Sequence, residues 1–258
     1  MAGVGADYEQ IMVPAIFRTW APIMADFVQL SAGERALDVA CGTGVVAREL
    51  LRHVGDKGTI VGCDSNAAML ATAHEVAPQI AWREGNALDL PFDSASFDVV
   101  TCQQGYQFFP DRVKAAQEAH RVLVGGGRIA VAVWCSLSEN PGQAAVVSAV
   151  EEFVGFDAAK IVGSAFGLGE KTQLQEFFSE ARFREVQSVT ETRPARFPSS
   201  EDFAIGFLRG GALARSGMEL SDDTMAHIIE RIGTSLAEYQ INNELVFPMS
   251  ANLVLAKK

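Results

Sequence analysis

The stretch that decides the fold is "LDVACGTGVVAREL", Leu37–Leu50, where a carboxylate lies within an apolar run and two glycines follow it. Gly42 and Gly44 allow the backbone to turn tightly and to approach a ligand closely. The residues from Val46 to Val54 then place apolar side chains at helical spacing. The stretch predicts a strand, a glycine turn and a helix whose free N–H groups point toward a ligand.

The same alternation of strand and helix continues along the first half of the chain. Helices are expected at 66–77 and 111–123, and strands at "GTIVGCD", "QIAWREGN", "SFDVVTCQQ" and "GGRIAVAVW". Strands that alternate with helices at this spacing imply right-handed crossovers and a parallel sheet covered on both faces. The first half is therefore predicted to be doubly wound α/β.

The second half is less regular. Helices are expected at 140–155, 171–181, 199–215 and 221–239, with strands at "REVQSVTETR" and "ELVFPMSANLVLAKK", the latter broken at Pro248. Two closing strands joined by a long helical excursion suggest an antiparallel pair at one edge of the sheet.

A single domain over 1–258 is expected, in three parts. A helical N-terminal flap covers 1–30, where Pro14 and Pro22 favour two short helices over one long helix. A ligand-binding core covers about 31–137, and a helical lid is inserted at about 194–241.

The composition excludes several classes of protein. Of 258 residues, 48% are hydrophobic and the formal net charge is −11, so a nucleic-acid backbone would be repelled. The start of the chain lacks a basic, apolar signal peptide, and no apolar run approaches the length that spans a bilayer, so a cytoplasmic protein with no membrane partner is expected. The four cysteines include no CxxC pair, and no metal site is expected.

A ligand in an open α/β sheet binds beyond the carboxyl ends of the strands. The run "GTGVVA" fits the G-x-G-x-x-A pattern, and Asp64, about 20 residues on, is placed to hold a ribose diol. Asp38 would repel a pyrophosphate but would favour a cofactor with an ammonium tail and a sulfonium centre. These residues favour S-adenosylmethionine, with S-adenosylhomocysteine as its product.

Four blocks over about residues 35–135 together resemble the class I S-adenosylmethionine-dependent methyltransferases, in particular the bacterial small-molecule group related to the ubiquinone and menaquinone enzymes. The blocks are "ALDVACGTGVVA", "IVGCDSNAAML", "REGNALDLPFDSASFDVVTCQQGYQFF" and "RVLVGGGRIAVAVW". The resemblance implies a Rossmann-like methyltransferase fold: a doubly wound, mostly parallel seven-stranded sheet with an antiparallel edge strand and helical lid elements.

The resemblance also implies roles for individual residues. Asp38 and the loop Ala40–Gly44 would surround the methionine portion, Asp64 would hold the ribose, and Asn86 would stand where the family usually has an adenine-binding Asp. An Asn side-chain oxygen can still accept that hydrogen bond. The cofactor-binding set implied is Asp38, Ala40, Cys41, Gly42, Thr43, Gly44, Asp64, Ser65, Met69, Asn86, Ala87, Gln103 and Gln104, with Tyr8 and Trp20 from the flap.

The predicted reaction is methyl transfer to an oxygen, nitrogen or carbon of a small, partly aromatic or apolar metabolite, with Tyr106 and Trp134 in the acceptor pocket. Positioning supplies most of the catalysis, and no catalytic base is assigned. The acceptor, the atom methylated and the oligomeric state stay open. Two alternatives are a non-catalytic cofactor-binding sensor or partner subunit and an NAD-dependent oxidoreductase. The latter is disfavoured by Asp38 and by the lack of a Tyr-x-x-x-Lys pair.

Overall fold

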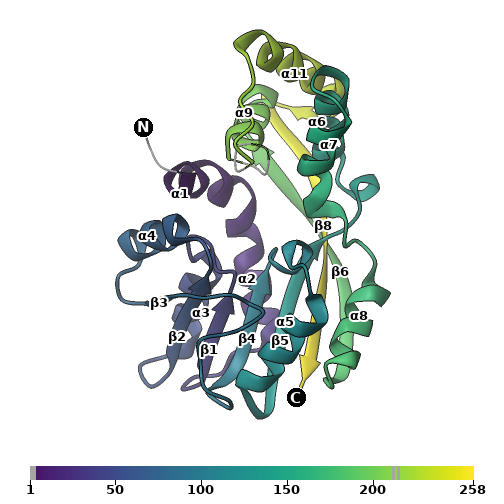
Figure 1. Ribbon diagram of the computed structural model, residues 1–258. Coiled ribbons are helices and arrows are strands. Elements are labelled where there is room, and N and C mark those ends of the chain that lie inside the picture. Colours follow the sequence, from purple (N-terminus) through teal and green to yellow (C-terminus); the bar gives the residue numbers. More distant parts are fainter. Residues whose placement is uncertain (1–3, 211–212, 214–215) are drawn as a thin grey trace.

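The computed structural model describes residues 4–210, 213 and 216–258 and contains an eight-stranded mixed sheet (Figure 1). Five parallel strands run in the order β3-β2-β1-β4-β5, followed by the antiparallel β8 and then β6 at the edge. The strands are β1 (Arg35–Val39), β2 (Thr59–Asp64), β3 (Ala81–Glu84), β4 (Phe97–Gln103), β5 (Leu123–Trp134), β6 (Arg184–Phe197), β7 (Gln240–Ile241) and β8 (Glu244–Lys257). The predicted fold class is confirmed: seven strands form the main path, and the short β7 adds an eighth beside β8.

Helices cover both faces of this sheet. The α-helices are α1 (Val4–Asp7), α2 (Arg18–Val28), α3 (Val45–Val54), α4 (Ala67–Val76), α5 (Arg112–Val122), α6 (Pro141–Phe153), α7 (Phe156–Gly163), α8 (Lys171–Glu180), α9 (Ser200–Gly210) and α11 (Asp222–Ser235). A π-helical segment η1 (Tyr8–Phe17) and the 3-10 turns η2 (Tyr106–Phe108), η3 (Leu137–Glu139), η4 (Ser164–Phe166) and η5 (Ala237–Tyr239) complete the set. Apolar residues of α2 and α3 pack on one face, and those of α5 and α8 pack on the other.

The strand order reverses at β1, which has β2 on one side and β4 on the other. The neighbouring β4 residues Val99 and Val100 are both fully buried but belong to the cores on opposite faces of the sheet. A strand buried on both faces reads as a continuous apolar run, and this is why the β4 sequence shows no alternation. The reversal puts a crevice at the carboxyl ends of β1 and β4.

The last two long strands leave the sheet and support the lid. β5 pairs with β8 only over Ala251–Lys257, whereas β6 pairs with β8 from Leu245 onward, so a two-stranded ribbon extends past the end of β5. Figure 1 shows this ribbon reaching the group of helices α6, α7, α9 and α11. The lid was expected to begin at about residue 194. It begins later, because β6 continues to Phe197 and the first helix of the insertion starts at Ser200.

The predicted break at Pro248 is wrong, since β8 is continuous through it. At this point β8 has a partner on one side only, and Pro248 lies opposite Pro194 of β6. Proline is tolerated where the missing N–H would have no ladder partner. The strand therefore loses little hydrogen bonding at Pro248.

The expected division of the flap into two short helices is also wrong. η1 contains Pro14, α2 contains Pro22, and the helical run continues from one into the other. A π-helical stretch has a wider hydrogen-bonding register, and burial of the apolar side chains along both segments offsets the bonds that proline cannot make. The fully or nearly fully buried ones include Met12, Ile16, Trp20 and Met24.

This helical run, Tyr8–Val28, is also long and apolar enough by length and composition to cross a membrane. The expectation that no apolar run approaches that length is wrong for this segment. Most of its buried side chains belong to the same core as those of α3, which is the arrangement of a packed core helix.

Candidate cofactor and acceptor site

A cavity of about 480 Å³ lies at the carboxyl ends of the parallel strands, between the sheet, the N-terminal helices and the lid. This size is within the range of small-molecule sites. The wall includes these residues expected from the sequence: Tyr8, Asp38, Ala40, Cys41, Gly42, Thr43, Asp64, Ser65, Met69, Asn86, Ala87, Gln103, Gln104 and Trp134.

Asp38 lies in the cavity wall with only 1% of its surface exposed. Its Oδ1 accepts a hydrogen bond from the Thr101 hydroxyl at 2.8 Å, and its Oδ2 accepts one from the backbone N–H of Ala47 at 3.2 Å. Asp38 therefore fixes the first turn of α3 as well as facing the cavity. Burial raises the pKa of its carboxyl group to about 7, while the two hydrogen bonds oppose this shift.

The two glycines of the turn serve different purposes. Both have positive φ, but a Cβ on Gly42 would meet no atom within 4 Å, whereas a Cβ on Gly44 would collide with the ring of Trp82. Gly42 lies in the cavity wall, where a ligand can approach its backbone. Gly44 is outside that wall, and it was expected to contact the cofactor. The structure instead places its backbone against the side chain of Trp82.

Asp64 ties the glycine turn to the second strand. Its Oδ2 accepts a hydrogen bond from the Gly42 N–H at 2.8 Å, and its Oδ1 accepts one from the Asn66 N–H at 2.9 Å. Asn66 in turn caps α4. A carboxylate has about four lone-pair sites, so both oxygens of Asp64 keep the capacity to accept from a diol.

Glu9 connects the N-terminal helix to the glycine turn. The Thr43 hydroxyl donates to Glu9 Oε2 at 2.6 Å, and Arg48 Nη2 lies 2.7 Å from Glu9 Oε1. The two contacts hold η1 against the loop and α3, over the cavity. Sequence reasoning missed Glu9, since nothing in a single sequence pairs it with Thr43 and Arg48, which lie 34 and 39 positions away.

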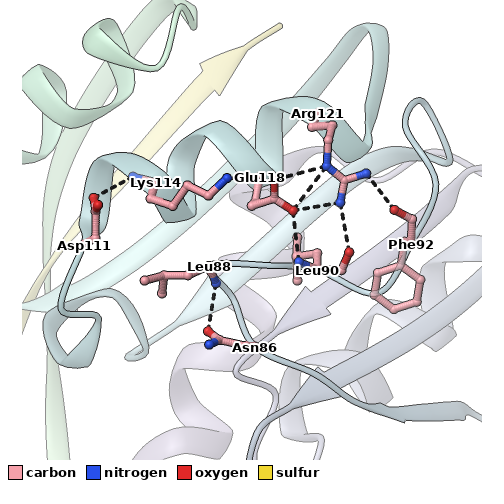
Figure 2. Close-up of polar contacts among 8 residues, drawn as sticks. All are labelled: Asn86, Leu88, Leu90, Phe92, Asp111, Lys114, Glu118 and Arg121. Atoms are coloured by element: carbon pink, nitrogen blue, oxygen red, sulfur yellow. Dashed lines mark hydrogen bonds and ion pairs between the residues drawn. The ribbon is translucent and has the colours of Figure 1, made fainter.

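The loop after β3 is held by an ion pair on α5 (Figure 2). Arg121 donates to the carbonyl oxygens of Leu90 and Phe92 at 2.9 and 2.7 Å and pairs with Glu118 at 2.7 Å. Glu118 accepts from the Leu90 N–H at 3.0 Å. Asn86 Oδ1 accepts from the Leu88 N–H at 2.9 Å, so the oxygen expected to meet adenine also shapes its own turn.

We predict that Arg121→Ala loosens this loop, lowers affinity for S-adenosylhomocysteine roughly tenfold and weakens discrimination against the hypoxanthine analogue S-inosylhomocysteine. The loop carbonyls of Leu90 and Phe92 would lose their donor, and Glu118 would keep only the longer contact with Lys114 at 3.4 Å. Calorimetry with both compounds measures the change. Arg52→Ala is a matched control, since Arg52 pairs with Glu49 at the same spacing and the same 2.7 Å but on an exposed surface. Equal effects of the two substitutions on selectivity would contradict the role of Arg121.

Besides Gly44, two further expected residues, Trp20 and Tyr106, lie outside the wall. Trp20 is buried behind Trp134, with the rings edge to face at 5.4 Å. Tyr106 is buried in the core on the other face of the sheet, against Phe109 and Phe178. Their expected contacts with cofactor and acceptor are corrected, because both side chains turn into protein rather than toward the cavity.

Much of the remaining wall is apolar and comes from parts of the chain far apart in sequence. Sequence reasoning missed these residues, since no local motif marks them: Met12, Ile16, Phe17, Val162, Phe166, Phe207 and Met249. Trp134 packs between Phe17 and Phe166, with ring centroids 6.2 and 6.5 Å away. Together η1, α7, η4, α9 and β8 therefore present a hydrophobic surface to the polar ends of the strands.

The cysteines and histidines carry no reactive arrangement. Burial raises the pKa of Cys63 and of Cys135 to about 12, and the pKa values of Cys41 and Cys102 are raised as well, so these side chains stay as thiols. Within the described part of the chain, no histidine lines the cavity and no group of three His, Cys, Asp or Glu side chains is placed to hold a metal ion.

A doubly wound sheet with a glycine turn, acids near the ends of two strands and a cavity beyond them is typical of α/β proteins that bind a nucleoside cofactor. The profile of the ubiE/COQ5 methyltransferase family matches residues 4–149. The chain belongs to this family.

Two similar proteins are also named as methyltransferases. The 2-phytyl-1,4-naphtoquinone methyltransferase of Thermosynechococcus vestitus is 40% identical over 119 residues, covering 45% of this chain and 53% of the relative. The ubiquinone/menaquinone biosynthesis C-methyltransferase UbiE of Hahella chejuensis is 34% identical over 170 residues, covering 62% and 66%. The chain thus spans about half the length of the first of these relatives.

Among solved structures, the YcgJ protein of Bacillus subtilis has the same fold, with a TM-score of 0.63 and 20% identity over 93% of this chain and 98% of that one.

Proposed function

We propose that this protein transfers a methyl group from S-adenosylmethionine to a small, apolar, quinone-type acceptor. The observation that carries the proposal is Asp38, a buried carboxylate in the wall of a cavity whose other polar groups fit a nucleoside. A buried acid of raised pKa gains most from a cationic ligand, because the cation stabilises its charged form. The family membership supports the same cofactor class.

The residues present fit this cofactor. The open space at Gly42, which a Cβ would fill, lets backbone and ligand approach closely. Gln103 Oε1 is buried without a partner at the end of β4 and is suited to accept from an ammonium group. Asp64 would hold the ribose hydroxyls, with Met69 and Asn86 beside the adenine. When bound, the cofactor supplies an electrophilic methyl group and leaves as a neutral thioether.

The acceptor side of the cavity favours an uncharged, flat molecule. Among the described residues, the wall contains no Lys, Arg or His, so a phosphate or carboxylate would find no counter-ion. The aromatic side chains of Phe17, Trp134 and Phe166 suit a ring system. The relatives named as naphthoquinone and ubiquinone/menaquinone methyltransferases support a quinone-type acceptor.

The chain's own contribution to the reaction is placement. The titratable groups of the described wall are Asp38, Asp64, Cys41 and Tyr8, and the first two have the roles given above. We assign no base, and an acceptor such as a hydroquinone releases its proton to bulk water when the methylated product leaves the cavity. Orientation of the two reactants and exclusion of water by the lid supply the acceleration.

A thermal-shift comparison tests the cofactor class. S-adenosylmethionine or S-adenosylhomocysteine at a concentration about 100-fold over its dissociation constant should add roughly 2.7 kcal/mol to the free energy of unfolding. The Tm should rise by about 5 to 10 °C. NAD and NADP should leave the Tm unchanged. A rise with a nicotinamide cofactor instead would overturn the proposal.

A further inference from the structure

Unpaired polar atoms are concentrated at the end of β4. Among the described residues, five buried side-chain oxygen or nitrogen atoms have no hydrogen-bond partner. Four of them belong to one five-residue segment, and they are Gln103 Oε1, Gln104 Nε2, Tyr106 OH and Gln107 Oε1. Buried polar groups without partners are rare and costly, so such a cluster calls for an explanation.

Two of these residues form a pair of side-chain amides. Gln107 Nε2 donates to Gln104 Oε1 at 3.1 Å, which leaves Gln104 Nε2 as a free donor and Gln107 Oε1 as a free acceptor. If both amides are turned over, the donor and acceptor exchange places. In either orientation the amide pair Gln104/Gln107 has one NH2 group and one C=O without a partner.

The amide pair lies next to η4 in the cavity wall, and this position assigns Gln104 to the acceptor rather than to the cofactor contacts expected from the sequence. Both residues line the wall, and Gln107, which is 6% exposed, belongs to η2, which packs against η4. η4 contributes Ala165 and Phe166 to the same wall. The free amide atoms are shielded from water, but the terminal torsion of a glutamine is soft. A small rotation about the terminal torsion of each glutamine would therefore point the free amide atoms toward a ligand in the cavity.

We propose that the amide pair is the polar recognition element for the acceptor, which carries a hydrogen-bond donor and a carbonyl-type acceptor close together on an otherwise apolar, neutral ring system. This inference rests on the proposed function and narrows its substrate class. We expect the acceptor to be neutral, because the described part of the cavity wall contains no cationic side chain to pair with an anionic acceptor. The apolar remainder would lie against Phe166, Phe207 and Met249.

Calorimetry in the presence of saturating S-adenosylhomocysteine tests the inference with two neutral bicyclic probes. Isocarbostyril presents an adjacent N–H and C=O, and N-methylisocarbostyril lacks the N–H donor. The protein should bind the first roughly tenfold more tightly, because the second leaves a buried acceptor unpaired. The single variants Gln107→Leu and Gln104→Leu should each abolish this preference. Equal binding of the two probes, or no binding of isocarbostyril, would contradict the inference.

Two further measurements separate recognition from a structural role. The double variant Gln104→Leu/Gln107→Leu should keep or raise the Tm of the ligand-free protein, because it removes unpaired buried amides. A lowered Tm would instead mean that the pair serves the fold. Gln173→Leu, on the exposed surface of α8, is the control for the substitution itself. If the native protein does not bind S-adenosylhomocysteine, the proposed function is contradicted. If it binds S-adenosylhomocysteine but does not prefer isocarbostyril over its N-methyl derivative, only the role proposed for the amide pair is contradicted.

Discussion

Asp38→Asn is expected to reduce affinity for S-adenosylmethionine by about 100-fold or more while leaving the ligand-free fold intact. Removing one partner of a buried charge pair costs about 2–5 kcal/mol in binding. The fold should survive because an Asn can keep both contacts of Asp38: its oxygen can accept from the Ala47 N–H, and its amide can donate to the Thr101 hydroxyl. Equilibrium dialysis and a thermal melt measure the two effects.

Asp98→Asn is the control for this substitution. Asp98 is on the neighbouring β4 but pairs with Arg35 at 3.0 Å and lies outside the cavity wall. It should alter stability slightly and leave the cofactor affinity unchanged. If Asp38→Asn bound the cofactor as well as the native protein, the carboxylate would be purely a cap for α3.

The pH dependence of Asp38 has a definite sign. Its folded-state pKa of about 7 lies above the ordinary value of 3.8, so its contribution to stability is present below about pH 4 and is lost as the pH rises through about 7. A cationic ligand lowers this pKa and expels the proton. Cofactor affinity should therefore increase with pH up to about 7 and then level off, and Asp38→Asn should abolish this dependence.

Gly44→Ala is expected to be among the most destabilising single changes in the chain, at about 2–5 kcal/mol, or a Tm lower by roughly 5 to 15 °C. Gly44 has a φ of +84°, and its added methyl group would meet the Trp82 ring. Two costs therefore combine: a left-handed backbone with a side chain, and an overpacked contact. Thermal denaturation measures the loss.

Gly42→Ala is the matched comparison two residues away. Its φ of +56° carries the same kind of backbone cost, but its Cβ points into open space. It should lower stability by only about 1 kcal/mol, while the methyl group hinders approach of the cofactor and weakens binding. Equal stability losses for both variants would contradict the role given to Trp82.

The sequence predicted the parts of the site that local motifs encode. Asp38, Gly42 and Asp64 belong to strand ends and turns whose spacing fixes where they meet, and the structure brings them together within one cavity wall. The mostly parallel, doubly wound sheet could be predicted because strands alternate with helices along the first half of the chain, but the order of the strands was not predicted.

The rest depends on packing between distant segments. The steric partner of Gly44 is Trp82, on a strand two positions across the sheet, and no spacing rule reveals it. Pro14 looked like the end of a helix, yet buried neighbours hold the helix together through it. The wall formed by Phe207 and Met249 requires the lid to fold back over the strands, which a local pattern does not encode.

The most direct test of the account is calorimetric titration of S-adenosylhomocysteine at about pH 6.5 in two buffers of different ionisation enthalpy. With a pKa of about 7, Asp38 is mostly protonated there, and the ammonium group of the ligand should expel up to about three quarters of a proton. We expect this proton release in the native protein and none in Asp38→Asn. Tight binding without proton release in the native protein would contradict the claim that Asp38 holds the cationic tail.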